Sequence, residues 1–270
     1  SNTSVGNEAL SANTTASSCT ALGRSALAAN TTANHNTAVG RDALLSTTTG
    51  GANSALGYEA LKNNTSGTYN TAIGRLAAKE NTTGTVNVAV GAGALLNNVL
   101  GSRSVAVGHN ALLNQNPASS SNPDNTAVGT FSLRNNTTGN DNTAVGFESL
   151  TRNTTGRNNV AIGLSALDHN TTGTTNVALG RDSLTANTTA DRNTALGHDS
   201  LKQATTGGSN IGIGTFAGDN ITTGSNNIVI GVFADASSAT VTDEITLGHT
   251  NISTLRCNVQ TISSLSDARD

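Results

Sequence analysis

The residues best suited to binding chemistry follow a glycine that recurs along the chain, in the one or two positions directly after it. Arginine, tyrosine, histidine and carboxylate side chains can hydrogen-bond to and stack against sugars or peptides. The ten candidates are Arg41, Tyr58, Glu59, Arg75, His109, Phe131, Phe147, Glu148, Arg181 and His198. This variable line is predicted to bind a glycan or a protein. The alternative is a solvated face with neighbouring ion pairs, each of which contributes little.

Catalytic and metal-binding patterns are missing from the sequence. The histidines fall in separate repeats without the spacing of a metal site, and no phosphate-binding loop, dinucleotide fingerprint or nucleophile elbow occurs. The acidic residues do not follow the pattern of calcium-filled β-rolls. We therefore expect no enzymatic activity, no cofactor and no metal site.

Composition excludes two further classes of partner. The formal net charge is -3, and the basic residues form no stripe of the kind that binds nucleic acid. Nor does any apolar run approach the ~20 residues that a membrane-spanning helix needs. We expect neither nucleic-acid binding nor membrane insertion.

The recurring glycine defines a tandem repeat. It follows Val, Ile or Leu at fifteen positions, from Gly6 to Gly248, and every spacing is 17 residues except one of 21. The consensus reads Asn-Thr-Ala-Val-Gly-x-x-Ala-Leu-x-x-Asn-Thr-Thr-Gly-x-x. A short fixed period indicates a solenoid in which each repeat is one structural unit. The longer spacing holds both prolines, Pro117 and Pro123, and predicts a loop that leaves the stack.

The content of the repeat favours strands over helices. Two glycines per period, β-branched residues and Asn-Thr-Thr-Gly turns oppose helix formation. We expect an all-β parallel β-solenoid in which Thr-Ala-Val forms a strand with Val pointing inward. The next residues would form a second short strand or a bend that buries Leu. Stacked coils would align Asn over Asn and Thr over Thr in ladders, and fifteen coils would extend roughly 70 Å.

The predicted core is thin. Aromatic residues make up only 2% of the chain, and each coil offers about two large aliphatic side chains, such as Val39 and Leu44. Their burial, at ~1.5–3 kcal/mol each, barely offsets the entropy of ordering one coil. Association of several rods along an apolar face would bury more surface per residue. The sequence therefore indicates an oligomer without fixing its number.

The repeats resemble those of known fibre proteins. Asn36-Thr37-Ala38-Val39-Gly40 and Asn70-Thr71-Ala72-Ile73-Gly74 are similar to the Asn-Ser-Val-Ala-Ile-Gly repeats of trimeric autotransporter adhesin heads, and to repeats of phage tail fibres. The resemblance covers residues 1–250 and implies a left-handed parallel β-roll, a homotrimer and attachment at a cell surface. The adhesin heads use somewhat shorter repeats, so the turns must differ.

The end of the chain carries a second resemblance. Ser266, Asp267 and Arg269 look like the start of the intramolecular chaperone found in phage tail fibres and endosialidases. This resemblance implies a chaperone that trimerises the fibre and is then cleaved near the motif. Residues 251–265 would form a neck between the repeats and the chaperone motif at 266–270.

Three functions remain open at this stage. One is a trimeric fibre segment that binds a cell-surface glycan or protein and lies outside the cell or on a virion. The second is a passive shaft whose binding tip lies elsewhere. The third is ice binding through stacked threonines, which Val88, Val105, Val160 and Val177 interrupt. The stacked threonines are Thr37, Thr71, Thr126, Thr143 and Thr194.

Overall fold

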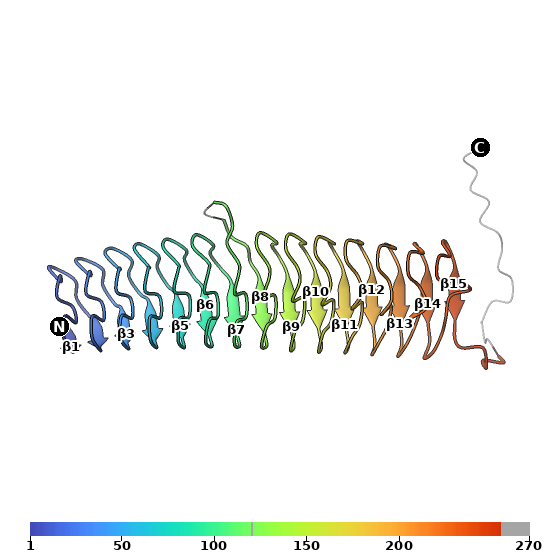
Figure 1. Cartoon of the computed structure of the whole chain (residues 1–270), viewed down its shortest axis with the longest axis horizontal. Helices are drawn as coiled ribbons and strands as arrows, with labels where there is room; N and C mark the ends of the chain where they lie inside the picture. The colour runs from blue at the N-terminus through green and yellow to red at the C-terminus, as the bar shows by residue number, and fades with distance from the viewer. Residues whose placement is uncertain (120, 255–270) are drawn as a thin grey trace.

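The chain forms a single elongated β-solenoid. The computed structural model describes residues 1–119 and 121–254. All fifteen strands lie in one parallel sheet in sequence order, so each coil pairs only with the coils before and after it (Figure 1). No helix occurs in these ranges. The predicted all-β parallel solenoid of 17-residue repeats is confirmed, and the longer spacing between β7 and β8 forms the loop that protrudes in Figure 1.

Each coil contributes one strand of three residues, placed directly before the repeat glycine. The strands are β1 (Thr3–Val5), β2 (Thr20–Leu22), β3 (Thr37–Val39), β4 (Ser54–Leu56), β5 (Thr71–Ile73), β6 (Val88–Val90), β7 (Val105–Val107), β8 (Thr126–Val128), β9 (Thr143–Val145), β10 (Val160–Ile162), β11 (Val177–Leu179), β12 (Thr194–Leu196), β13 (Ile211–Ile213), β14 (Ile228–Ile230) and β15 (Ile245–Leu247).

The strands turn their middle residue inward and their two flanking residues outward. Ala38 is fully buried, whereas Thr37 is exposed and Val39 is half-buried. The prediction that Val points into the coil was therefore wrong. The interior is narrow and already holds Leu44 and buried asparagines, so it accepts the small alanine and leaves both larger neighbours on the outer face. The sheet thus presents two rows of side chains to the outside.

The sequence allowed either a second short strand or a bend after the glycine. The structure has the bend, and this bend buries Leu. Leu44 has a φ of 51° and is fully buried. A left-handed residue reverses the chain within a few positions, which places the leucine side chain at the centre of the coil. A second strand does not form in any coil that the structure describes.

The asparagine ladders are confirmed, and they run inside the solenoid. In the row before the strands, the amide N–H of Asn53 donates to Asn36 Oδ1 at 2.9 Å, and Asn53 Nδ2 donates to the Gly67 carbonyl at 2.8 Å. In the row after the leucines, Asn170 Nδ2 donates to Asn153 Oδ1 at 2.8 Å. These side chains are buried and must be paired, because an unpaired buried amide is costly. The ladders therefore fix the register of successive coils.

The threonine ladder differs from the expectation. In the Asn-Thr-Thr-Gly turns, the hydroxyl of the first threonine donates to a backbone carbonyl of the next coil, as from Thr14 Oγ1 to the Thr31 carbonyl at 2.9 Å. The threonines of the strands are in register from coil to coil, as in Thr3↔Thr20↔Thr37, and lie on the outer face.

Two matched substitutions preserve the amide network beside the protruding loop. Ser104 replaces Asn in the row before the strands, and Gln115 replaces Asn in the other row. Gln115 Nε2 donates to Ser104 Oγ at 2.9 Å, and its Oε1 accepts from Asn125 Nδ2 at 2.8 Å. The longer glutamine therefore bridges the gap that the shorter serine leaves.

Several positions per coil hold a non-glycine residue in the left-handed region. Val86 has a φ of 59° and is an unfavourable residue there, because its branched Cβ crowds the backbone. Asn158 occupies the equivalent position in another coil, directly before the asparagine that precedes the strand, with a φ of 57°. We expect Val86→Asn to stabilise the rod by about 1 kcal/mol, measured as a higher midpoint of urea unfolding. Asn158→Val should lower that midpoint by a similar amount, and an unchanged midpoint in both variants would contradict the prediction.

Candidate binding surface

The variable positions form a continuous line along the rod, here called the corner row. It consists of the residue directly after each repeat glycine: Asn7, Arg24, Arg41, Tyr58, Arg75, Ala92, His109, Thr130, Phe147, Leu164, Arg181, His198, Thr215, Val232 and His249. The preceding strands pair in exact repeat register, as in Val39↔Leu56↔Ile73, so corner residues of successive coils are neighbours. Seven sequence candidates lie in this row; Glu59, Phe131 and Glu148 lie one position later, where φ is positive.

The structure brings four sequence candidates together in the N-terminal third. The Arg41 guanidinium lies 5.5 Å from the centre of the Tyr58 ring and 3.2 Å from Asp42 Oδ2. Arg75 is exposed in the next coil. Glu59 is buried beneath this surface, so its carboxylate is not presented to a ligand.

Glu59 is held by two lysines that sequence reasoning did not select. Its carboxylate lies 2.9 Å from Lys62 Nζ and 3.1 Å from Lys79 Nζ. The hydrogen bond from Lys62 is the largest influence, and together with the contact to Lys79 it lowers the pKa of Glu59 to about 2. Both lysines are the fifth residue after a repeat glycine, so the 17-residue period could have identified them as neighbours.

This ion cluster predicts a specific acid sensitivity. Because the pKa of Glu59 is lower in the folded state, its stabilising effect is complete above the unfolded value near 4.5 and is lost as the pH falls toward about 2. We expect wild type to be more stable than Glu59→Gln at pH 6, and the difference to shrink between pH 4.5 and 2. Urea unfolding of both proteins across this range measures it. A difference that does not change with pH would show that the ion cluster does not stabilise the fold.

A second group of candidates is aromatic and lies near the middle of the rod. His109 and Phe131 meet edge to face with ring centres 5.3 Å apart, and Phe131 and Phe147 do so at 6.1 Å. The Arg134 guanidinium lies 5.0 Å from the Phe131 ring centre. Glu148 is half-buried beside Phe147. The group presents an apolar surface, and Phe147 keeps 47% of its surface exposed.

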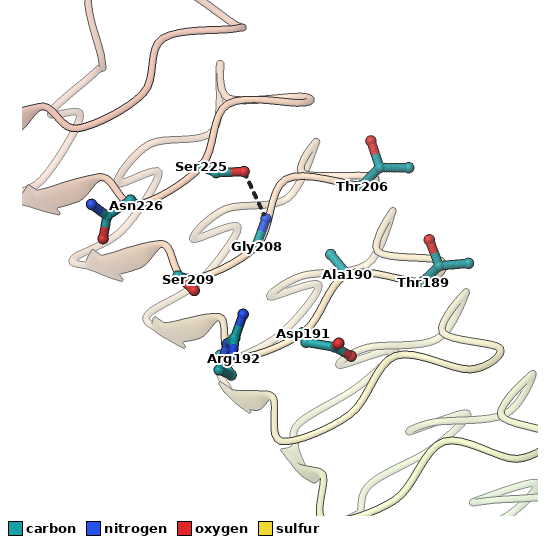
Figure 2. Close-up of a pocket in the computed structure, with 9 residues that line it drawn as sticks. All are labelled: Thr189, Ala190, Asp191, Arg192, Thr206, Gly208, Ser209, Ser225 and Asn226. Atoms are coloured by element: carbon teal, nitrogen blue, oxygen red, sulfur yellow. Dashed lines mark hydrogen bonds between the residues drawn. The ribbon is translucent and has the colours of Figure 1, made fainter.

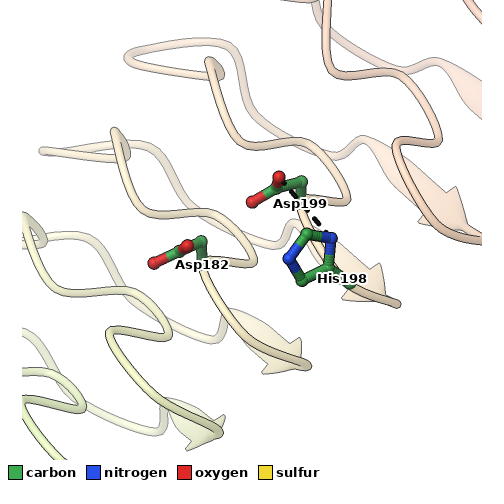
Figure 3. A group of neighbouring side chains, drawn as sticks. All are labelled: Asp182, His198 and Asp199. Carbon is green, nitrogen blue, oxygen red and sulfur yellow. Dashed lines mark ion pairs between the residues drawn. The ribbon is translucent and has the colours of Figure 1, made fainter.

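The third group surrounds Arg181 and His198. Arg181 Nε lies 3.1 Å from Asp182 Oδ2, and His198 Nδ1 lies 3.5 Å from Asp199 Oδ2 (Figure 3). Asp182, His198 and Asp199 could each offer a ligand atom to a metal ion, since those atoms lie within 4.8 Å of one another. Lys202 Nζ, however, lies 3.0 Å from Asp199 Oδ1 and 3.9 Å from Asp182 Oδ2. The lysine already supplies the counter-charge, so we interpret this group as an ion-pair network.

An aromatic row follows toward the C-terminus and was not among the sequence candidates. Phe216 and Phe233 stack with ring centres 5.1 Å apart, and His198 and His249 contact the two ends of this pair. Asp219 lies nearby, and both burial and the neighbouring Asp235 carboxylate raise the pKa of Asp219. The occurrence of Phe in two consecutive repeats was the sequence signal that could have identified this row.

Two shallow polar grooves occur at one and the same place in the repeat. One has a volume of about 360 Å³ and lies beside Gly208, and the other has a volume of about 250 Å³ and lies beside Gly51. Figure 2 shows the first, in which the Gly208 N–H donates to Ser225 Oγ at 3.2 Å. Gly-Gly pairs at 50–51 and 207–208 leave out a side chain that most other coils carry there. The grooves offer mostly polar groups and little apolar surface for a ligand.

The candidate binding residues are thus spread over three groups along the rod and form no single pocket. Ser266, Asp267 and Arg269, with most of the predicted neck at 251–265, lie outside the described residues. Within the described ranges, no helix is long and apolar enough to span a membrane. No protein-family model matches this chain, and no curated protein matches its sequence.

Proposed function

We propose that this chain is a segment of a homotrimeric fibre that attaches to a surface by binding a glycan or protein through the corner row. The observation that carries the proposal is the outer face of the sheet. Its second row is aliphatic in all fifteen strands, and ten of these side chains keep between 37% and 57% of their surface exposed. An apolar surface of this extent marks an interaction site.

The size of this face suits association between copies of the chain. Fifteen strands at ~4.8 Å extend roughly 70 Å, and two rows of side chains make a strip about 10 Å wide. The resulting area, on the order of 700 Å², is close to the ~800 Å² that each partner contributes to a stable protein interface. The occupant we propose is therefore a second and a third copy lying alongside the first.

A three-fold arrangement uses both outer rows. The first row alternates between Thr, Ser, Val and Ile, whereas the second is always Val, Leu or Ile. Around a three-fold axis, the first row of one chain can pack against the second row of its neighbour, and repetition of this contact closes the ring. The core of a single chain also contains few large apolar side chains, because its interior is largely Ala, Leu and Asn.

The corner row supports the attachment role. It lies beyond the glycine that ends each strand, so packing of the sheet faces would leave it accessible. Arg41, Tyr58, Phe147 and Arg181 are exposed there and offer charge, hydrogen bonds and aromatic surface. Binding through this row would place the segment outside the cell or on a virion surface.

The native mass of the purified chain, from light scattering coupled to size exclusion, tests the assembly. We expect three times the 27.0 kDa of one chain. The trimer should then bind intact cells or a glycan array, whereas a trimer that binds neither would be a passive shaft. A folded monomer would contradict the proposal.

Ice binding is the remaining candidate, and the in-register outward threonines such as Thr3, Thr20 and Thr37 favour it. A monomer that shows thermal hysteresis would replace the trimeric fibre by an ice-binding solenoid. We expect no thermal hysteresis, because aliphatic residues fill the second row and interrupt the first.

A further inference from the structure

We infer that four residues near the N-terminus bind an acidic polysaccharide through its carboxylate or sulfate groups. These residues, here called the arginine patch, are Arg24, Arg41, Tyr58 and Arg75. The inference rests on the proposed attachment function and names its ligand class and its place on the rod.

The patch is a straight line of exposed groups with regular spacing. Its members occupy the corner row of four successive coils, whose strands pair in the register Leu22↔Val39↔Leu56↔Ile73. Successive coils are ~4.8 Å apart, so the first two arginines are about 5 Å apart along the rod and the second and third about 10 Å. A linear polymer with a charged group on each repeating unit can contact such a line at several points together.

The arginines are available for a ligand. Among the residues that the structure describes, no carboxylate lies within ion-pairing distance of Arg24 or Arg75. The nearby carboxylate of Glu59 is buried and is neutralised by Lys62 and Lys79. The corner row of these four coils therefore carries positive charge and no carboxylate; the exposed carboxylate of Glu8 lies outside the row, where it accepts a hydrogen bond from Ser25. A guanidinium binds carboxylate and sulfate groups through two parallel hydrogen bonds.

Arg41 is held in place before any ligand binds. It lies over the Tyr58 ring and contacts Asp42, so less side-chain freedom is lost on binding. Tyr58 also places an exposed aromatic ring between Arg41 and Arg75, where it can contact the apolar face of a sugar ring.

The corner row around Arg181, in the C-terminal third, is not cationic in this way. Arg181 pairs with Asp182, and Asp199, Asp219 and Asp235 lie in the following coils. Arg181 and Lys202 balance only two of these four carboxylates, so an anionic ligand would meet repulsion there. The matched control is Arg157, because it is an exposed arginine that lies outside the corner row.

A polysaccharide fits the patch better than an acidic peptide. Peptide recognition depends on apolar anchors that enter pockets. The groove beside Gly51, which lies in the same part of the rod as the patch, is shallow and polar. Charge spaced evenly along a line, without an anchoring pocket, is the feature that a repeating acidic sugar would match.

The experiment measures binding of the native protein to four immobilised polymers: heparin, polygalacturonate, neutral dextran and polyglutamate. We expect binding to at least one acidic polysaccharide, weakening with salt because exposed charges are screened. The triple variant Arg24→Gln/Arg41→Gln/Arg75→Gln should bind that polysaccharide roughly tenfold or more weakly. Arg157→Gln should bind like wild type, and circular dichroism should show that both variants are folded.

Each outcome separates this inference from the proposed function. Equal binding by the triple variant and Arg157→Gln would overturn the inference, and so would binding to dextran or polyglutamate as tight as to the acidic polysaccharides. A trimer that attaches to cells without responding to the triple substitution would overturn the inference and leave the proposed function intact. A monomer that binds acidic polysaccharide through the patch would overturn the trimer and support the inference.

Discussion

Lysine at both Val128 and Ile162 should convert the proposed homotrimer into folded single chains. Both side chains point outward from the sheet, in strands β8 and β10, and each keeps 37% of its surface exposed in the single chain. Lysine is tolerated on an exposed sheet face, so each coil should still form. In the proposed trimer, the second row of one chain packs against the first row of its neighbour, so each interface would bury two unpaired ammonium groups, each at a cost of several kcal/mol.

The measurement is the native mass of the double variant, together with its circular dichroism. Leu164→Lys is the matched control, because Leu164 lies in the same coil as Ile162, is also exposed, and belongs to the corner row. We expect this control to keep the mass of three chains. A double variant that stays trimeric would show that the chains associate through another face, whereas loss of β-structure would be read from circular dichroism and separated from dissociation.

The architecture was predictable because the same 17-residue period sets both the positions of the strands and the alignment of the side chains between coils. The 17-residue spacing of the glycines placed all fifteen strands, and the constant asparagines predicted the ladders that the structure contains. The direction in which each strand faces was not predictable in the same way. A three-residue strand alternates sides only once, so the pattern Thr-Ala-Val allows either Ala or its two neighbours to point inward. The narrow coil decides this in favour of Ala38.

The candidate surface was predictable as a line but not as groups. Register alone makes Arg41 and Tyr58 neighbours, and the structure shows their contact. The sequence did not indicate that Glu59 is buried or that Lys62 and Lys79 hold it, because these partners belong to another face of the coil. Contacts between rows depend on how the coil folds back on itself. The distance between side chains of two rows therefore cannot be read from the repeat pattern alone.

The repeat glycines are the positions where a single methyl group should have the largest effect on the fold. Gly163 has a φ of 137°, a region that residues with a Cβ rarely adopt. A Cβ there would lie 2.5 Å from the carbonyl oxygen of Gly180 and 2.6 Å from its carbonyl carbon. Both are backbone atoms of the next coil, so no side-chain rotation can relieve the contact. Gly163→Ala must therefore separate the two coils or change the local backbone.

We expect Gly163→Ala to destabilise the rod by about 3 kcal/mol or more, from backbone strain together with loss of the contact between coils. A solenoid is held by contacts between neighbouring repeats, so the damage should be local and should divide the rod at this point. Hydrogen exchange should show lost protection in β10 and β11 while β3 and β4 stay protected. Thr155→Ala, an exposed threonine in the turn before β10, should leave exchange unchanged. Wild-type protection at β10 and β11 in Gly163→Ala would show that the coils can accommodate a side chain at the glycine row, and that the row does not set the spacing between them.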